Sequence, residues 1–202
     1  MFTNRLQSEN KIGGFIKSII TGTPSVLSEL DQSTINELDI TVTTNSANVE
    51  LAKKIALSTI LTEDKVDFEQ PIIDSLDNIL PNIGVIDSGD LHTIVEKDND
   101  VNLIVVHDET VAPGYNINNI TTEEVARLNK IMSKTQGNVE STINGNSSIL
   151  AQIQSDSDST GNQNLNLTIN DISNVDDGHK ITLATSKSNV SFNGISDNYD
   201  NL

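Results

Sequence analysis

The sequence predicts an α+β protein, with helices in the N-terminal 80 residues and near 122–135, a β-hairpin at 90–107 and a β-rich C-terminal third. Its 25 Ile residues stand in short runs of helical or strand period. Its 25 Asn, 18 Asp, 21 Ser and 19 Thr favour turns and caps, because these side chains hydrogen-bond their own backbone. Apolar residues make up only 35% of the chain. We therefore expect a folded chain with short elements and many loops.

Residues 1–22 are predicted to form a basic amphipathic arm. Residues 1–20 hold three basic residues against one Glu, a formal charge of +2, whereas the whole chain carries −17. Five apolar residues follow a helical spacing and are candidates for docking a partner: Ile12, Phe15, Ile16, Ile19 and Ile20. An ordinary first helix that packs on its own core would show the same stripe, so both interpretations stay open.

Residues 23–112 are predicted to form an α+β core. Thr23 and Pro24 favour a helix start, and Ser46 is a candidate N-cap. Alternating apolar and polar residues predict a strand. The expected elements are a helix from 24, a strand at 38–42, a helix at 47–61 and a helix between Pro71 and Pro81.

The hairpin at 90–107 is predicted from two β-rich runs around a polar turn. Leu91–Lys97 and Val101–His107 are rich in β-branched residues, and Asp98–Asp100 separates them. The prediction implies antiparallel pairing of the two runs.

Residues 113–154 admit two interpretations. Thr121 to Glu124 form a capping box, so a helix begins near 122. An unbroken heptad spacing continues to 153, which would make one coiled-coil helix. Gly137 and the dipeptide Asn144-Gly145 favour instead a helix that ends near 136, followed by strands at 139–143 and 147–153.

Residues 155–202 are predicted to be a linker followed by a β-rich tail. The Ser/Asp-rich stretch 155–162 has the composition of a linker. Alternating apolar residues predict the strands 165–169, 181–185 and 190–192.

The composition argues against several function classes. The acidic charge disfavours nucleic acid, and there is no Cys for thiolate chemistry. Neither a transmembrane segment nor a secretory signal is expected, and no catalytic, cofactor or metal motif is present. His107 with Asp108 and Glu109 is the best candidate for a hydrolytic or metal centre. Oxygen-rich loops near 98–100, 156–158 and 176–178 lack the pattern of an EF-hand.

The function that best fits these observations is non-enzymatic. We expect a structural or assembly protein that acts through contacts with other protein subunits, as a homo- or hetero-oligomer and without cofactors. Its composition is typical of tailed-phage virion components (capsid, neck or tail accessory proteins), which would place it in the virion and otherwise in the cytoplasm. An acidic DNA-mimic inhibitor is the alternative, and a small hydrolase or metal enzyme around His107 is the third hypothesis.

Overall fold

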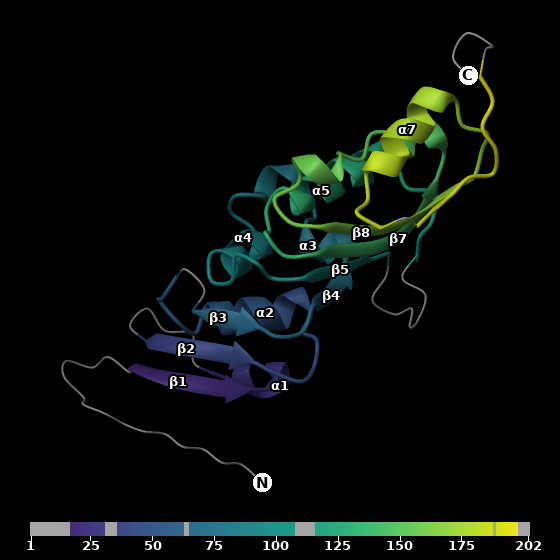
Figure 1. Cartoon of the computed structure of the whole chain (residues 1–202). Coiled ribbons are helices and arrows are strands. Elements are labelled where there is room, and N and C mark those ends of the chain that lie inside the picture. The colour runs from purple at the N-terminus through teal and green to yellow at the C-terminus, as the bar shows by residue number, and fades with distance from the viewer. Residues whose placement is uncertain (1–16, 31–35, 63–64, 108–115, 188, 198–202) are drawn as a thin grey trace.

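The protein is a stack of coils, each made of a strand segment and a helical return. The computed structural model describes residues 17–30, 36–62, 65–107, 116–187 and 189–197. The molecule is elongated, with the first strand, β1, at one end and the last, β9, at the other (Figure 1). This arrangement is that of a solenoid, in which each repeat packs on its neighbours.

All strand pairs in the described part of the chain are parallel. One sheet has the order β1-β2-β3, and a second has the order β4-β5-β7-β8-β9 with β6 also on β7. The strands are β1 (Lys17–Gly22), β2 (Glu37–Val42), β3 (Val66–Phe68), β4 (Ile72–Ser75), β5 (Leu103–Val106), β6 (Asn116–Ile117), β7 (Val139–Gly145), β8 (Gln163–Ile169) and β9 (Val190–Ser191).

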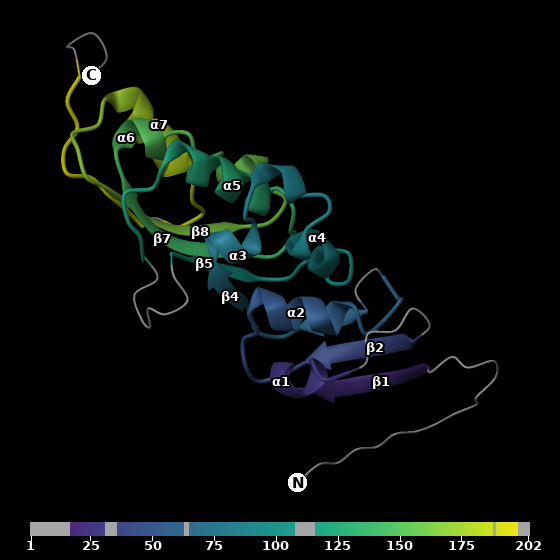
Figure 2. The same ribbon diagram turned by 180° about the vertical axis from the view of Figure 1, so that it is seen from behind.

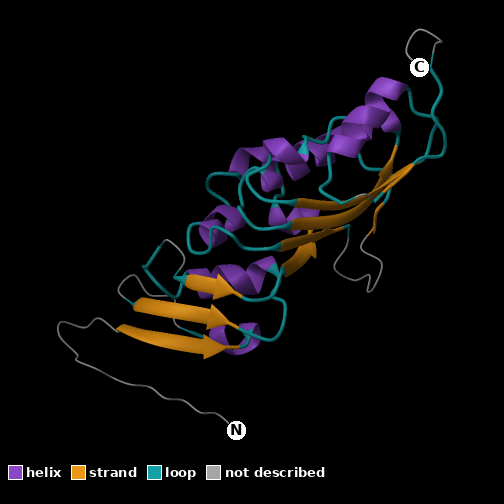
Figure 3. Cartoon of the chain, viewed as in Figure 1, coloured by secondary structure: helices purple, strands orange, loops and turns teal. Residues whose placement is uncertain are grey.

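Two positions in the stack are occupied by pairs of short strands. β3 pairs with β2, and β4 follows it in the chain after Pro71, whose missing N–H cannot continue a ladder. Similarly, β5 pairs with the beginning of β7 and β6 with its end. The two sheets therefore follow one another along the molecule, as Figure 3 shows.

The helices return the chain along one side of the sheets (Figures 1 and 2). Consecutive coils bring them into contact: α1 with α2, α2 with α4, α3 with α5, α5 with α6, and α6 with α7. The helices are α1 (Pro24–Leu27), α2 (Val49–Ala56), α3 (Leu76–Ile79), α4 (Asp90–Val95), α5 (Thr122–Met132), α6 (Ser147–Leu150) and α7 (Val175–Leu183), with 3₁₀ turns η1 (Ile83–Val85) and η2 (Asp156–Asp158).

The hydrophobic core runs between the helices and the sheets. Alternate residues of the longer strands are buried, so β7 and β8 each turn one face to the helices and one away. The helices contribute their own apolar stripes, such as Val49, Ala52 and Ile55 of α2. One continuous cluster extends from Leu27 to Ala184.

Polar side chains fix the starts of α2, α6 and α7 to the next coil. The N-cap residues of α2 and α7, Asn48 and Asn174, accept a backbone N–H of the first turn. The first N–H of α2, α6 and α7 donates instead to an Asp of the following coil, with distances of 2.9, 2.7 and 3.1 Å. The acceptors are Asp74, Asp171 and Asp197.

A buried threonine closes three of the coils. The Thr185 hydroxyl accepts the Leu165 N–H at 3.1 Å and contacts the Leu165 carbonyl at 2.9 Å. Thr59 makes the same pair of bonds to Leu38. Thr135 donates to the Val101 carbonyl at 2.7 Å. Each hydroxyl thus joins the end of a helical return to the beginning of an earlier strand or, for Thr135, to the residue two positions before β5.

Two glycines allow neighbouring coils to approach closely. A Cβ on Gly137 would overlap the backbone carbonyl oxygens of Asp100 and Val101, and one on Gly161 would overlap the Gly137 carbonyl oxygen. The helix-breaking character of Gly137 predicts that it interrupts a coiled coil. In the structure Gly137 lies after the end of α5 and has a different role. It fits a backbone-to-backbone contact between coils.

The predicted fold class is therefore wrong in its layout. Strands are spread through the described chain from β1 to β9 and alternate with seven helices, so there is no helical N-terminal part and no β-rich C-terminal third. The predicted hairpin at 90–107 is also wrong, because residues 90–95 form α4. Leu91 and Ile94 are buried three positions apart, which is a helical spacing.

Three further elements differ in type from their predictions. Residues 17–22 form β1 rather than part of an amphipathic helix, 72–75 form β4 before α3 begins, and 175–183 form α7 where a turn and a strand were expected. In each of these segments the run is so short that its apolar β-branched residues fit both a helical and a strand period. Contacts with the neighbouring coil then decide which element forms.

Neither interpretation of 122–153 is correct as a whole. The capping box at Thr121 is confirmed, and α5 ends at Met132. The strand expected at 139–143 is present as β7, but residues 147–150 form α6 instead of the second arm of a hairpin. The strands predicted at 38–42, 165–169 and near 190 are confirmed as β2, β8 and β9.

Candidate functional site

The outer face of the second sheet carries a field of neutral polar side chains. In β7 and β8 the buried residues alternate with residues on the side away from the helices. Glu140 of β7 is one of these outward residues and is charged; we call the neutral ones, together with those of β9 and the residue before it, the amide face. Its members are Thr142, Asn144, Asn164, Asn166, Thr168, Asn189 and Ser191.

Side chains of the amide face hydrogen-bond from coil to coil. Asn189 Nδ2 donates to Asn166 Oδ1 at 2.7 Å, and Asn166 Nδ2 donates to Thr142 Oγ1 at 3.3 Å. Asn164 Nδ2 donates to Glu140 Oε1 at 3.3 Å. An amide both donates and accepts, so such a row still offers free lone pairs or N–H groups to a second molecule.

The corresponding face of the first sheet is charged. Asp39 of β2 lies opposite Ile19 of β1 in the ladder, and Lys65 Nζ lies 3.6 Å from Asp39 Oδ2. Asp67 of β3 is exposed. The helix-free side of the molecule thus changes from ionic over β1–β3 to mainly neutral over β7–β9, where Glu140 and Lys187 form an ion pair at 3.4 Å.

The two ends of the stack leave apolar residues exposed. At the β1 end Ile19 is 77% exposed and Val26 of α1 is 46% exposed. At the β9 end Ile172, Leu183 and Ile195 are exposed. Within the described chain β1 pairs with β2 alone and β9 with β8 alone, so each presents an outer edge.

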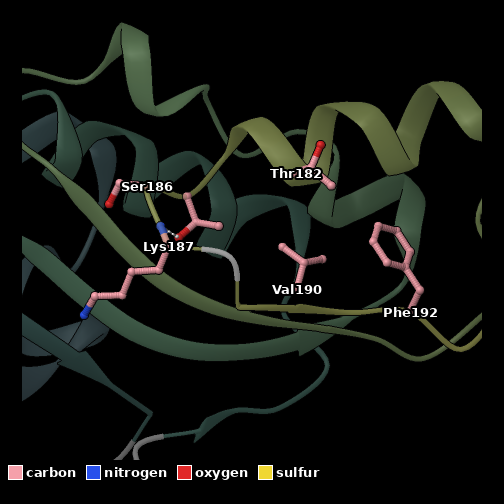
Figure 4. Close-up of a pocket in the computed structure, with 6 residues that line it drawn as sticks. Thr182, Ser186, Lys187, Val190 and Phe192 are labelled. Carbon is pink, nitrogen blue, oxygen red and sulfur yellow. Dashed lines mark hydrogen bonds between the residues drawn. The ribbon is translucent and has the colours of Figure 1, made fainter.

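A cavity of about 300 Å³ opens at the β9 end. Figure 4 shows Val190 of β9 and Phe192, directly after β9, pointing toward α7, which carries Thr182. The Phe192 ring packs against Gly178, where an added Cβ would lie 3.3 Å from the ring. The Thr185 hydroxyl at its floor accepts the Lys187 N–H at 3.2 Å. The cavity is the unfilled end of the layer between helices and sheet.

No family model, curated protein or solved structure matches this chain.

The structure describes only some of the predicted docking residues. Ile19 and Ile20 lie on β1, with Ile20 packed against the core and Ile19 on the outer face. They point to opposite sides of a strand, so they do not share the helical stripe that predicted them. Ile12, Phe15 and Ile16 lie outside the described residues.

The three histidines stand apart from one another. His107 is exposed directly after β5, and its predicted companions Asp108 and Glu109 lie outside the described residues. His92 Nε2 lies 3.4 Å from Glu96 Oε1 on α4. His179 is exposed on α7. Among the residues that the structure describes, no group of three or more His, Asp or Glu could hold a metal ion.

The acidic loops considered for calcium serve the backbone. Asp98 Oδ2 accepts the Phe68 N–H at 2.9 Å, and Asp156 Oδ1 accepts the Gln163 N–H at 2.7 Å. The predicted turn at Asp177 is the first turn of α7, where its N–H donates to Asn174.

Two buried ionisable neighbours have shifted pKa values. Burial raises the pKa of Asp98 to about 8, with Asp100 and Asp67 adding to the shift and the Phe68 N–H opposing it. Burial also lowers the pKa of Lys97, whose Nζ donates to the Leu61 carbonyl at 2.6 Å. The Asp98 carboxyl is therefore largely protonated at neutral pH.

Sequence reasoning missed the amide face and both ends of the stack. The available signal was an internal period, since Asn-Gly or Asn-Asp recurs at 144, 170 and 193. The register gives a similar spacing, with Val139 beside Gln163 and Leu167 beside Val190. Among the described residues, no helix has both the length and the apolar composition needed to span a membrane.

Proposed function

We propose that this chain is a non-enzymatic assembly protein that binds another protein subunit over its amide face. The observation that carries the proposal is the helix-free sheet surface over β7–β9, which has mainly neutral hydrogen-bonding groups, with Glu140 and Lys187 as a charged pair, and no covering element in the described chain. Neutral amides cost less to desolvate than charges do, so such a surface suits a protein contact.

The placement of the carboxylates favours assembly over DNA mimicry. A mimic needs acids displayed as a stripe. Here Asp74, Asp156 and Asp171 are occupied by backbone N–H groups of this chain. Their negative charge is used in part to hold coils together. The tailed-phage virion setting rests on composition and stays a prediction, as does the enzymatic hypothesis around His107.

A photo-crosslinking residue at position 168 tests the proposal in the cell that encodes the protein. Thr168 is exposed at the centre of the amide face, and Thr122, exposed at the start of α5, is the matched control on the helix side. We expect irradiation to give discrete protein adducts from position 168 and not from position 122.

Thr168→Arg should then remove the complex that the crosslink defines, whereas Thr122→Arg should leave it intact. Absence of a discrete adduct at 168, or equal adducts at both positions, would overturn the proposal.

A further inference from the structure

We propose that the β1 end of one copy of this chain docks on the β9 end of another, so that copies associate head to tail. The proposal goes beyond the amide face, since it uses the two ends of the stack. It commits to a second copy as the occupant of the β9 end and its cavity.

The strand directions permit continuation of the sheet across the contact. Every described pair is parallel, and β1 and β9 are the two terminal strands of the stack. A second copy can therefore place β1 beside β9 in the orientation that each strand has toward its own neighbour. Such a contact forms main-chain hydrogen bonds along an open edge.

The layers of the two ends also correspond. Ile20 of β1 faces the core, as its register with buried Ile40 shows, and Val190 of β9 does so beside buried Leu167. All of these residues belong to the edge or the body of one core. Docking would put Ile20 against Val190 and Phe192, at the mouth of the cavity.

On the helix side the same docking places α1 beside α7. Val26 of α1 and Leu183 of α7 are each 46% exposed, which is high for apolar residues within helices. Inside the molecule α1 packs on α2 and α7 on α6. The intermolecular contact would therefore repeat the helix-to-helix contact of consecutive coils and cover both side chains.

Formal charge makes this pairing favourable and disfavours like ends. Residues 1–22 hold three basic residues and one Glu. Residues 170–202 hold five Asp and two Lys. The residues that precede and form β1 in the chain thus differ in the sign of their net charge from those that follow β8, which favours pairing of unlike ends, whereas two β9 ends would repel each other. The contact is heterologous and does not close a dimer, so it gives chains or rings of copies.

Two end variants and a central control test the inference with the purified full chain. Val26→Glu blocks the β1 end, and Leu183→Lys blocks the β9 end, because each places a charge where the contact would bury an apolar side chain. Ile83→Glu is the control, because Ile83 is 39% exposed on η1, away from both ends. Sedimentation velocity over a concentration series measures the mass.

We expect the wild type and Ile83→Glu to associate with rising concentration in steps of one chain. Each end variant alone should bind about a hundredfold more weakly or not at all, because a charge is buried without a partner. Mixing the two end variants should restore a one-to-one dimer and nothing larger, since each retains one intact end.

A wild type that stays monomeric at its highest soluble concentration would overturn the inference. So would association that both end variants retain, or a mixture that forms no dimer. The mixture also checks folding, because an unfolded variant could not restore association, and circular dichroism of each variant separates that case. These outcomes do not depend on crosslinks from the amide face, so the two proposals fail separately.

Discussion

The two halves of the stack differ in their buried ionisable residues, although buried threonines serve backbone groups in both. Around β2–β5 the buried polar residues include Asp74, Lys97, Asp98 and Arg127. Around β7–β9 they are neutral: Ser141, Gln163, Ser173 and Thr185. The first half has coils of unequal length, with Ile40 opposite Val66 and Leu103 opposite Val139, whereas the second keeps offsets of 24 and 23 residues.

This difference shows how repeat regularity affects the choice of buried polar group. A carboxylate has several lone pairs and can serve donors that arrive from unrelated directions, as Asp74 does for two backbone N–H groups and Asn78. A hydroxyl that donates and accepts serves the equivalent position in both halves, as Thr59 and Thr185 do. The irregular half should therefore depend more strongly on single ionisable residues.

The largest expected effect is that of Asp74→Ala. The change leaves the Val49 and Ser75 N–H groups and the Asn78 amide without their acceptor at a site that is 2% exposed. Each orphaned group costs about 1–3 kcal/mol, so we expect a loss of about 4 kcal/mol in the free energy of unfolding, measured with urea. Asp171→Ala, at the equivalent but half-buried position, should lose about 1–2 kcal/mol. Equal losses would remove the contrast between the halves.

A second effect concerns pH and Asp98. Its pKa is about 8 in the folded chain and near its ordinary value when unfolded, so between these values only the folded state holds the proton. The contribution of Asp98 to the free energy of unfolding should therefore fall as pH rises, by up to about 1.4 kcal/mol per pH unit. Urea unfolding at pH values across this window measures the slope.

Asp98→Asn should flatten that slope, because the amide cannot lose a proton and its oxygen can still accept the Phe68 N–H. Asp158→Asn, at an exposed position on η2, should retain the slope of the wild type. A wild-type slope unchanged by Asp98→Asn would assign the pH dependence to other groups.

The smallest effect is expected in the neutral half. Thr185→Val keeps the shape of the side chain but removes the acceptor of the Leu165 and Lys187 N–H groups, so we expect a loss of about 2 kcal/mol. Thr182→Val, on the exposed side of α7, should change stability by no more than about 0.5 kcal/mol. A loss at Thr185 as large as that at Asp74 would show that neutral buried residues contribute as much to the free energy of unfolding as buried ionisable ones.

The sequence predicts an element correctly where the motif that specifies it lies within that element. The capping box at Thr121 and the alternation in 38–42 act within one element, and both are confirmed. Asp98–Asn99–Asp100 was mistaken for a hairpin turn because its role depends on a distant partner. Asp98 serves the Phe68 N–H, thirty residues earlier in the chain.

The candidate surfaces could not be derived from single elements. The amide face exists because the register places the outward residues of neighbouring strands side by side. Asn166 lies beside Thr142 on the outer side, and Leu167 lies beside Val190 on the inner side. A one-residue change of register would turn the other face outward. The exposure of Leu183 likewise follows from its place at the end of the stack, since the helices before α7 are covered by the next coil.

Because each coil mainly contacts the coils next to it, the stack should respond to a pulling force one coil at a time. The main element contacts of β7, β8 and β9 are with adjacent coils, so a force applied across the stack loads one interface at a time. Coils would peel from an end in sequence rather than rupture together. Each coil of the regular half, with its 24- or 23-residue offset, would release about 8 nm of extended chain. The molecule would thus yield in nearly equal steps from its β9 end and in unequal ones from its β1 end.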